Sequence, residues 1–157
     1  MQTWRKRQLL NRGGYGEWTA LHIACKRDPP ADVIRNLCEL SLAPAETFDL
    51  YNKLPIHYAA EYGADVKVMR VLIECCPQSL SGIDNEGRTP LHLSFKYSIQ
   101  DPATLVDPMR RFPSVEEVDL LLGGEAAVLW TTEENDYLPL HYAVSNIDCC
   151  TLDVLEK

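Results

Sequence analysis

A six-residue pattern around histidine occurs four times in this 157-residue chain. The four segments align without a gap, reading TALHIA at 19–24, LPIHYA at 54–59, TPLHLS at 89–94 and LPLHYA at 138–143. Their histidines are separated by 35, 35 and 49 residues and are His22, His57, His92 and His141. Because the last interval exceeds the others by 14 residues, we expect a regular repeat that carries one insert of that length.

Each copy is expected to begin with a short helix at this pattern. Proline is favoured in the first helical turn, where its missing N–H would have no partner, and it stands two residues before the histidine at Pro55, Pro90 and Pro139. Thr19 and Thr89 can cap the same turn with their hydroxyls. We predict helices of seven or eight residues, which end before Gly63 in the second copy and before residues 28–30 in the first.

A second helix is expected to follow in each copy, because apolar residues recur there at helical spacing. They are Val33, Ile34 and Leu37 in the first copy and Val68, Met69, Leu72 and Ile73 in the second. In the third copy, Val115, Val118, Leu121 and Leu122 match Val66, Met69, Leu72 and Ile73 at an offset of 49. The histidines give the same offset, so we place the insert between the two helices of the third copy, within residues 98–113.

A polar turn precedes each of the last three histidines. Gly87 stands five residues before His92, and Asn52 and Asp136 occupy the matching positions of their copies. Glycine, asparagine and aspartate tolerate the left-handed backbone of a tight turn. The linking segments are therefore predicted to be hairpin-like fingers.

The DNEGRTPLHL run at 84–93, followed by a pair of short helices, closely resembles the ankyrin repeat, and the other copies match it less fully. The resemblance covers about residues 16–157 and implies a mainly α-helical solenoid of antiparallel helix pairs linked by hairpin-like turns. The expected units are a basic lead-in at 1–15 and repeats at 16–50, 51–85, 86–134 and 135–157. The last repeat is incomplete, so we expect a slice of a longer array.

The histidines also bear on catalysis, because the repeat pattern uses all four of them. The resemblance implies that each ring hydrogen-bonds within its own turn and to the backbone of the neighbouring repeat. The sequence lacks a phosphate-binding loop, a G-x-S-x-G elbow and an H-E-x-x-H motif. We therefore expect no enzymatic activity, no catalytic residue, no cofactor and no metal site.

Composition narrows the compartment and the class of partner. With 15 basic and 23 acidic residues the net charge is −8, which disfavours nucleic acid and anionic membranes as partners. The longest apolar run, at 126–130, is far too short to span a membrane. No secretion signal precedes the six cysteines, so we expect six free thiols and a cytoplasmic location, with nuclear and organellar locations left open.

The resemblance implies a partner surface on the concave side, made from the fingers and the first helices. The position four residues before each histidine holds aromatic and cationic residues, types enriched at binding hot spots: Trp18, Lys53, Arg88 and Tyr137. Positions just after the histidines add Lys26, Glu61, Tyr62, Lys96 and Tyr97. The insert adds a basic pair, Arg110 and Arg111. Ordinary solvated surface and a tolerated insert are the competing interpretations.

The resulting functional prediction is a monomeric, non-enzymatic module that binds an unknown protein partner through this concave face. The alternative is a regulatory or targeting segment of a larger enzyme or signalling protein whose catalytic domain lies outside this chain. Charge reversal of Arg110 and Arg111, compared with Trp18→Ala and Arg88→Ala, would separate the insert from the column as the binding element.

Overall fold

The computed structural model describes residues 16–27, 29–40, 45–96, 113–123 and 126–144. These ranges hold seven α-helices and no strand, which confirms the mainly α-helical fold. The helices are α2 (Ala20–Cys25), α3 (Ala31–Leu40), α4 (Pro55–Glu61), α5 (Val66–Cys75), α6 (Pro90–Lys96), α7 (Val115–Leu122) and α8 (Pro139–Val144). Two short 3₁₀ helices follow α5 and α7, namely η1 (Pro77–Ser81) and η3 (Ala126–Trp130).

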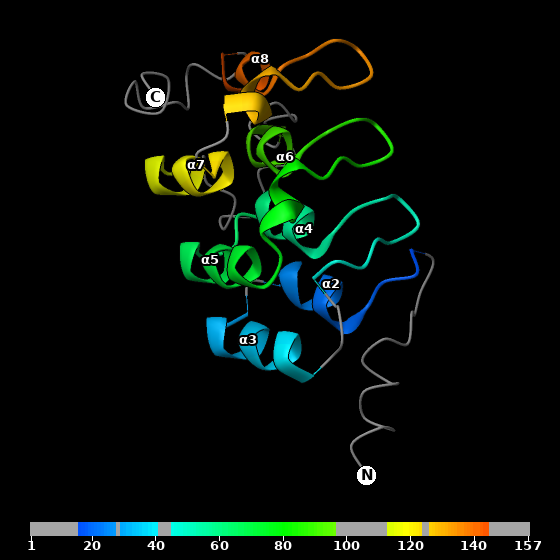
Figure 1. Ribbon diagram of the computed structural model, residues 1–157, viewed down its shortest axis with the longest axis vertical. Helices are drawn as coiled ribbons and strands as arrows, with labels where there is room; N and C mark the ends of the chain where they lie inside the picture. The colour runs from blue at the N-terminus through cyan, green and yellow to red at the C-terminus, as the bar shows by residue number, and fades with distance from the viewer. Residues whose placement is uncertain (1–15, 28, 41–44, 97–112, 124–125, 145–157) are drawn as a thin grey trace, which may run out of the picture.

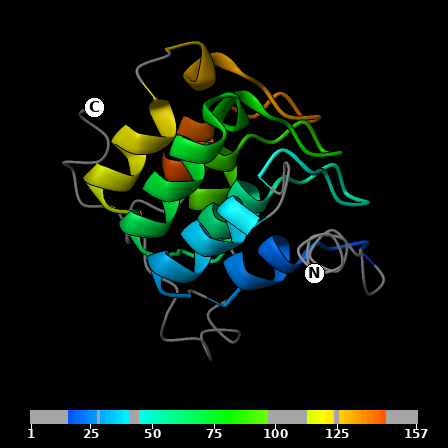
Figure 2. The same ribbon diagram turned by 60° about the horizontal axis from the view of Figure 1, so that its bottom comes forward.

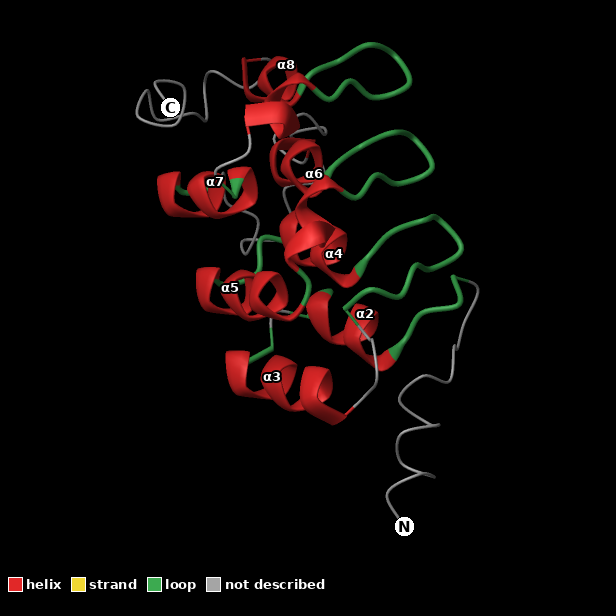
Figure 3. Cartoon of the chain, viewed as in Figure 1, coloured by secondary structure: helices red, strands yellow, loops and turns green. Residues whose placement is uncertain are grey.

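The helices are arranged in two rows (Figure 1). The first row contains α2, α4, α6 and α8, which pack against one another in this order, and the second row contains α3, α5 and α7. Across the rows, α2 packs on α3, α4 on α5 and α6 on α7. The loops that lead into the first-row helices all project from the side opposite the second row (Figures 2 and 3).

The first-row helices begin where the sequence predicts. Thr19 Oγ1 accepts a hydrogen bond from the backbone N–H of His22, and Thr89 makes the same cap on α6. The helices α4 and α6 have seven residues, whereas α2 has six and is thus shorter than predicted, ending before Pro29 and Pro30 prevent its continuation. Gly63, in a left-handed conformation with a φ of 65°, follows the end of α4 as expected.

The second-row helices carry caps of their own. Asp65 Oδ1 accepts from the N–H of Lys67 at 2.7 Å before α5. Before α7, Ser114 and Glu117 form a reciprocal capping box. Residues 62–65 separate α4 from α5, whereas residues 97–114 separate α6 from α7, so the extra residues of the third copy lie between its two helices. Most of this insert, with Tyr97, Arg110 and Arg111, lies outside the described residues.

The core fills the space between the rows. The position before the histidine is buried in α2, α4 and α6, where it is Leu21, Ile56 and Leu91, and the facing second-row side chains Ile34, Leu72 and Leu121 are buried as well. Each such burial contributes about 1.5–3 kcal/mol. Helices of six to ten residues are unstable alone, so packing between units supplies the stability. Val33, by contrast, is 43% exposed on α3, which packs on α2 and α5 and is the first described helix of its row.

The same left-handed backbone occurs five residues before every histidine. The φ angles are 57° at Asn52, 76° at Gly87 and 62° at Asp136, as the residue types predict. Glu17 occupies the equivalent position before His22 and has a φ of 53°, which its residue type does not predict. The position in the repeat therefore determines the left-handed backbone, and the residue type determines only how much conformational free energy that backbone costs.

Four of the six cysteines are described, and all four are free thiols: Cys25, Cys38, Cys75 and Cys76. The pKa of Cys38 is raised to about 12, mainly by burial and to a lesser extent by a hydrogen bond with Cys75. Burial also raises the pKa of Cys25 and Cys76, so these thiols stay protonated at neutral pH. None of the described helices has the length and apolar character that crossing a bilayer requires.

Substitution of Gly63 and of Gly87 by alanine should distinguish the cost of a strained backbone from the cost of a steric clash. Both are left-handed, but a Cβ on Gly63 would meet nothing within 4 Å, whereas a Cβ on Gly87 would lie 3.2 Å from Glu133 Cα. We expect Gly63→Ala to lower the free energy of unfolding by about 1–2 kcal/mol. Gly87→Ala should cost about 1–3 kcal/mol more, because the next finger must move. Urea unfolding followed by circular dichroism measures both, and equal losses would show that neighbouring fingers do not constrain Gly87.

Candidate partner-binding surface

The loops before α4, α6 and α8 form three fingers, residues 49–53, 84–88 and 133–137. Each is closed by a backbone hydrogen bond from its first residue to the carbonyl of its last, at 3.0 Å from Asp49 to Lys53, 3.0 Å from Asp84 to Arg88 and 3.1 Å from Glu133 to Tyr137. We call the surface made by these fingers and the first-row helices the finger face.

An acid at the start of each finger holds its backbone, and the sequence analysis did not identify it. Asp49 Oδ1 accepts from the N–H groups of Tyr51 at 2.9 Å and Lys53 at 2.8 Å. Asp84 Oδ1 accepts from Glu86 at 3.0 Å and Arg88 at 2.9 Å in the same way. The acid stands eight residues before the histidine in all three fingers, so the repeat alignment contains the signal that finds it.

Neighbouring fingers are joined through their backbones. The N–H of Asn85 donates to the carbonyl of Tyr51, and the N–H of Glu134 donates to that of Glu86, both at 3.0 Å. Asn52 adds a side-chain bond, its Nδ2 donating to the carbonyl of Ile83 at 2.8 Å. The fingers therefore form a connected edge, and a ligand on this face meets a fixed backbone.

The motif histidines bind two units at once. The N–H three residues earlier donates to Nδ1 in all four copies, from Thr19 at 3.1 Å, Leu54 at 3.0 Å, Thr89 at 3.1 Å and Leu138 at 2.8 Å. Since Nδ1 accepts, the proton of a neutral ring is on Nε2. That nitrogen donates to a carbonyl before the next first-row helix, from His22 to Lys53 at 3.0 Å, from His57 to Gly82 at 3.2 Å and from His92 to Tyr137 at 3.1 Å.

Burial keeps the rings of His57 and His92 neutral. Desolvation lowers the pKa of His57 to about 4, although nearby Asp84 and the carbonyls of Gly82 and Arg88 favour the charged form. Burial lowers the pKa of His92 too. With both ring nitrogens bonded to backbone, His22, His57 and His92 have no lone pair left for a substrate or a metal ion. The described residues also hold no group of three or more histidine, cysteine or acidic residues placed to bind a metal ion.

An aromatic cluster lies where α2 meets α4. Trp18 Nε1 donates to Asp49 Oδ2 at 3.0 Å and to the Tyr58 hydroxyl at 2.9 Å, and that hydroxyl donates to Asp49 Oδ2 at 2.6 Å. Lys26 Nζ lies 4.1 Å from the centre of a Trp18 ring and 5.4 Å from those of Tyr58 and Tyr62. A cation over several rings is stabilised by about 0.5–2 kcal/mol, so Lys26 has a defined position.

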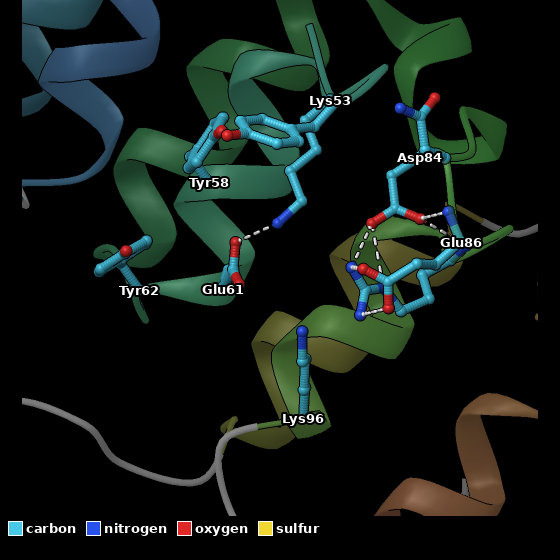
Figure 4. Close-up of a pocket in the computed structure, with 10 residues that line it drawn as sticks. Lys53, Tyr58, Glu61, Tyr62, Asp84, Glu86 and Lys96 are labelled. Atoms are coloured by element: carbon cyan, nitrogen blue, oxygen red, sulfur yellow. Dashed lines mark hydrogen bonds and ion pairs between the residues drawn. The ribbon is translucent and has the colours of Figure 1, made fainter. Parts of the chain in front are cut away.

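A groove of about 230 Å³ opens beside this cluster. Figure 4 shows the groove with its lining residues drawn as sticks. The complete lining comes from the first and second fingers, α4 with the residue after it, and α6, and consists of Tyr51, Lys53, Tyr58, Glu61, Tyr62, Asp84, Asn85, Glu86, Arg88 and Lys96. Lys53 Nζ pairs with Glu61 Oε2 at 2.6 Å. Arg88 pairs with Asp84 Oδ2 at 2.8 Å and bonds Glu86 Oε1 at 2.6 Å.

The candidate contact residues differ in how far they are exposed to a partner. Lys53 and Arg88 are only 8% and 4% exposed, and their charges are used inside the protein. Trp18, Lys26 and Tyr62 are partly buried in the aromatic cluster, and Tyr137 is 52% exposed on the last finger. Glu61, Tyr62 and Lys96, three of the candidate contact residues, line the groove together with Tyr51, Asp84 and Glu86.

No protein-family model matches the chain, and no curated protein matches it. The function is therefore inferred from the residues and their geometry.

The buried histidines make stability depend on pH. The folded pKa of His57, about 4, lies below the ordinary 6.5, so its contribution is complete above pH 6.5 and is lost as the pH falls toward 4. The loss is about 1.4 kcal/mol per pH unit for one such ring. We expect His57→Gln to be less stable than the parent at pH 7 but to lose less stability between pH 6.5 and 5. Urea unfolding at stepped pH measures this, and parallel pH profiles for the two proteins would contradict it.

Proposed function

We propose that this chain is an ankyrin-like repeat array that binds a partner protein through its finger face and catalyses no reaction. The repeat assignment is supported by matching contacts at matching offsets. The finger closure, the bond between fingers and the histidine Nδ1 bond recur at spacings of 35 residues, or 49 across the insert. The Nε2 bonds of His22 and His92 also reach carbonyls at matching positions, those of Lys53 and Tyr137, whereas that of His57 reaches Gly82. Each helix packs on the next helix of its row, as in a stack of repeats that contact only their neighbours.

The groove is the observation that carries the binding proposal. It combines three tyrosines with ion-paired lysine and arginine side chains on one face, and tyrosine and arginine are enriched at binding hot spots. The fingers also present exposed apolar side chains at Leu50, Tyr51 and Tyr137. Because the hydrogen bonds of the fingers fix these side chains before a partner arrives, binding loses little conformational entropy.

Two equally exposed residues, one on the finger face and one on the second row of helices, test whether the finger face binds the partner. Tyr51, on the first finger, and Leu40, at the end of α3, are each 48% exposed. With the intact chain as bait, a partner captured from cell extract and identified by mass spectrometry should bind Tyr51→Ala at least about tenfold more weakly, a loss of about 1.4 kcal/mol. Leu40→Ala should bind as the parent does.

Two outcomes would move the binding site elsewhere. Equal binding by Tyr51→Ala and the parent would remove the finger face from the proposal. Loss of binding on charge reversal of Arg110 and Arg111, with Tyr51→Ala unaffected, would assign the contact to the insert. Thermal unfolding of each variant checks that it is folded.

A further inference from the structure

Lys96 occupies a special place in the groove. It is the last residue of α6, and its side chain points toward the space between Glu61 and Glu86 (Figure 4). On one side is the Lys53–Glu61 ion pair, at 2.6 Å, and on the other is Arg88 with its two acids, Asp84 and Glu86. Lys96 is thus a third cation, placed between a neutral ion pair and a group of three charges whose sum is −1.

The ammonium of Lys96 has no hydrogen bond or ion pair with any residue that the structure describes, yet it is partly buried. Burial lowers the pKa of Lys96. The positive charges of Arg88 and Lys53 lower this pKa further, whereas the negative charges of Glu61 and Glu86 raise it. Taking an ammonium out of water costs free energy unless an acceptor replaces the lost water. The nearby acids bind Lys53 and Arg88, and an oxygen of a ligand in the groove would supply Lys96 with an acceptor.

The size and lining of the groove limit that ligand. Its volume of about 230 Å³ is below the range of about 300–1,000 Å³ that small-molecule sites occupy, so it holds about one side chain. Tyr51, Tyr58 and Tyr62 line it and offer ring surface to an aliphatic stem. The fitting group is therefore a short stem with an oxygen-bearing head.

We propose that the groove binds one acidic side chain from an extended segment of the partner, with Lys96 Nζ as its anchor. This inference rests on the proposed function and specifies the chemistry of the partner. A carboxylate gives Lys96 a hydrogen bond in which both partners are charged, whereas a glutamine offers the ammonium only a neutral carbonyl oxygen. The net charge of −8 repels acidic tracts, so the segment carries this acid among neutral or apolar residues.

A displayed library of random heptapeptides, selected on the intact chain, tests the inference. Peptides enriched by the parent should share one acidic position. A synthetic copy of an enriched peptide, amidated at its C-terminus so that the side chain is the only source of the carboxylate, should bind at least about tenfold more tightly than its Glu→Gln or Asp→Asn copy. Fluorescence anisotropy measures both affinities.

Three lysine variants identify the anchor. Lys96→Gln should bind the acidic and amide peptides equally, and Lys96→Arg, which keeps the cation, should retain the preference for the acid. Lys67→Gln is the matched control, because Lys67 is an exposed lysine on α5, in the second row. It should behave as the parent does, and thermal unfolding confirms that each variant is folded.

The remaining outcomes overturn the inference without ambiguity. Enrichment of peptides without an acid, equal binding of acid and amide copies by the parent, or no enrichment at all would each show that Lys96 is not a carboxylate anchor. The proposed function fails separately, when a captured partner binds Tyr51→Ala as tightly as the parent. A partner lost by Tyr51→Ala but indifferent to Lys96→Gln would retain the function and reject the anchor.

Discussion

The structure depends on a neutral imidazole that bonds two consecutive units. Its Nδ1 accepts the N–H at the start of its own helix, and its Nε2 donates to a carbonyl in the segment before the next one, as His22 does with Thr19 and Lys53. One side chain thereby sets both where a helix begins and where the following finger lies. Because the helices are too short to be stable alone, this link and the apolar contacts beneath it hold the stack together.

Further hydrogen bonds hold the finger face in place. Each finger is closed by its own backbone, held by an acid such as Asp49 or Asp84, and bonded to its neighbour. Lys53 and Arg88 pair with acids in and around the fingers, so the charges that shape the groove are positioned before any ligand enters. Lys96 differs because it projects from the end of a helix and no finger supplies its acceptor.

The local features of this fold were predictable from sequence, and the paired charges were not. Helix starts, the left-handed turns at Asn52 and Gly87 and the position of the insert follow from rules that act over a few residues. The burial of Lys53 depends on Glu61, eight residues away across a finger and a helix, and no local pattern specifies that contact. Glu17 adopts a left-handed backbone against its own preference, because the repeat requires the turn there.

The burial of Arg88 changes how this face should be studied. Its side chain and that of Asp84 are 5% and 1% exposed, and removing one partner of such a pair leaves the other charge buried without compensation, at a cost of about 3–5 kcal/mol. Asp84 also holds the backbone of its finger, so Arg88→Ala would disturb the fold along with any contact. Loss of binding in that variant would not identify a contact residue. Substitution of an exposed residue of the same groove, such as Tyr51, tests binding without removing a partner of a buried ion pair.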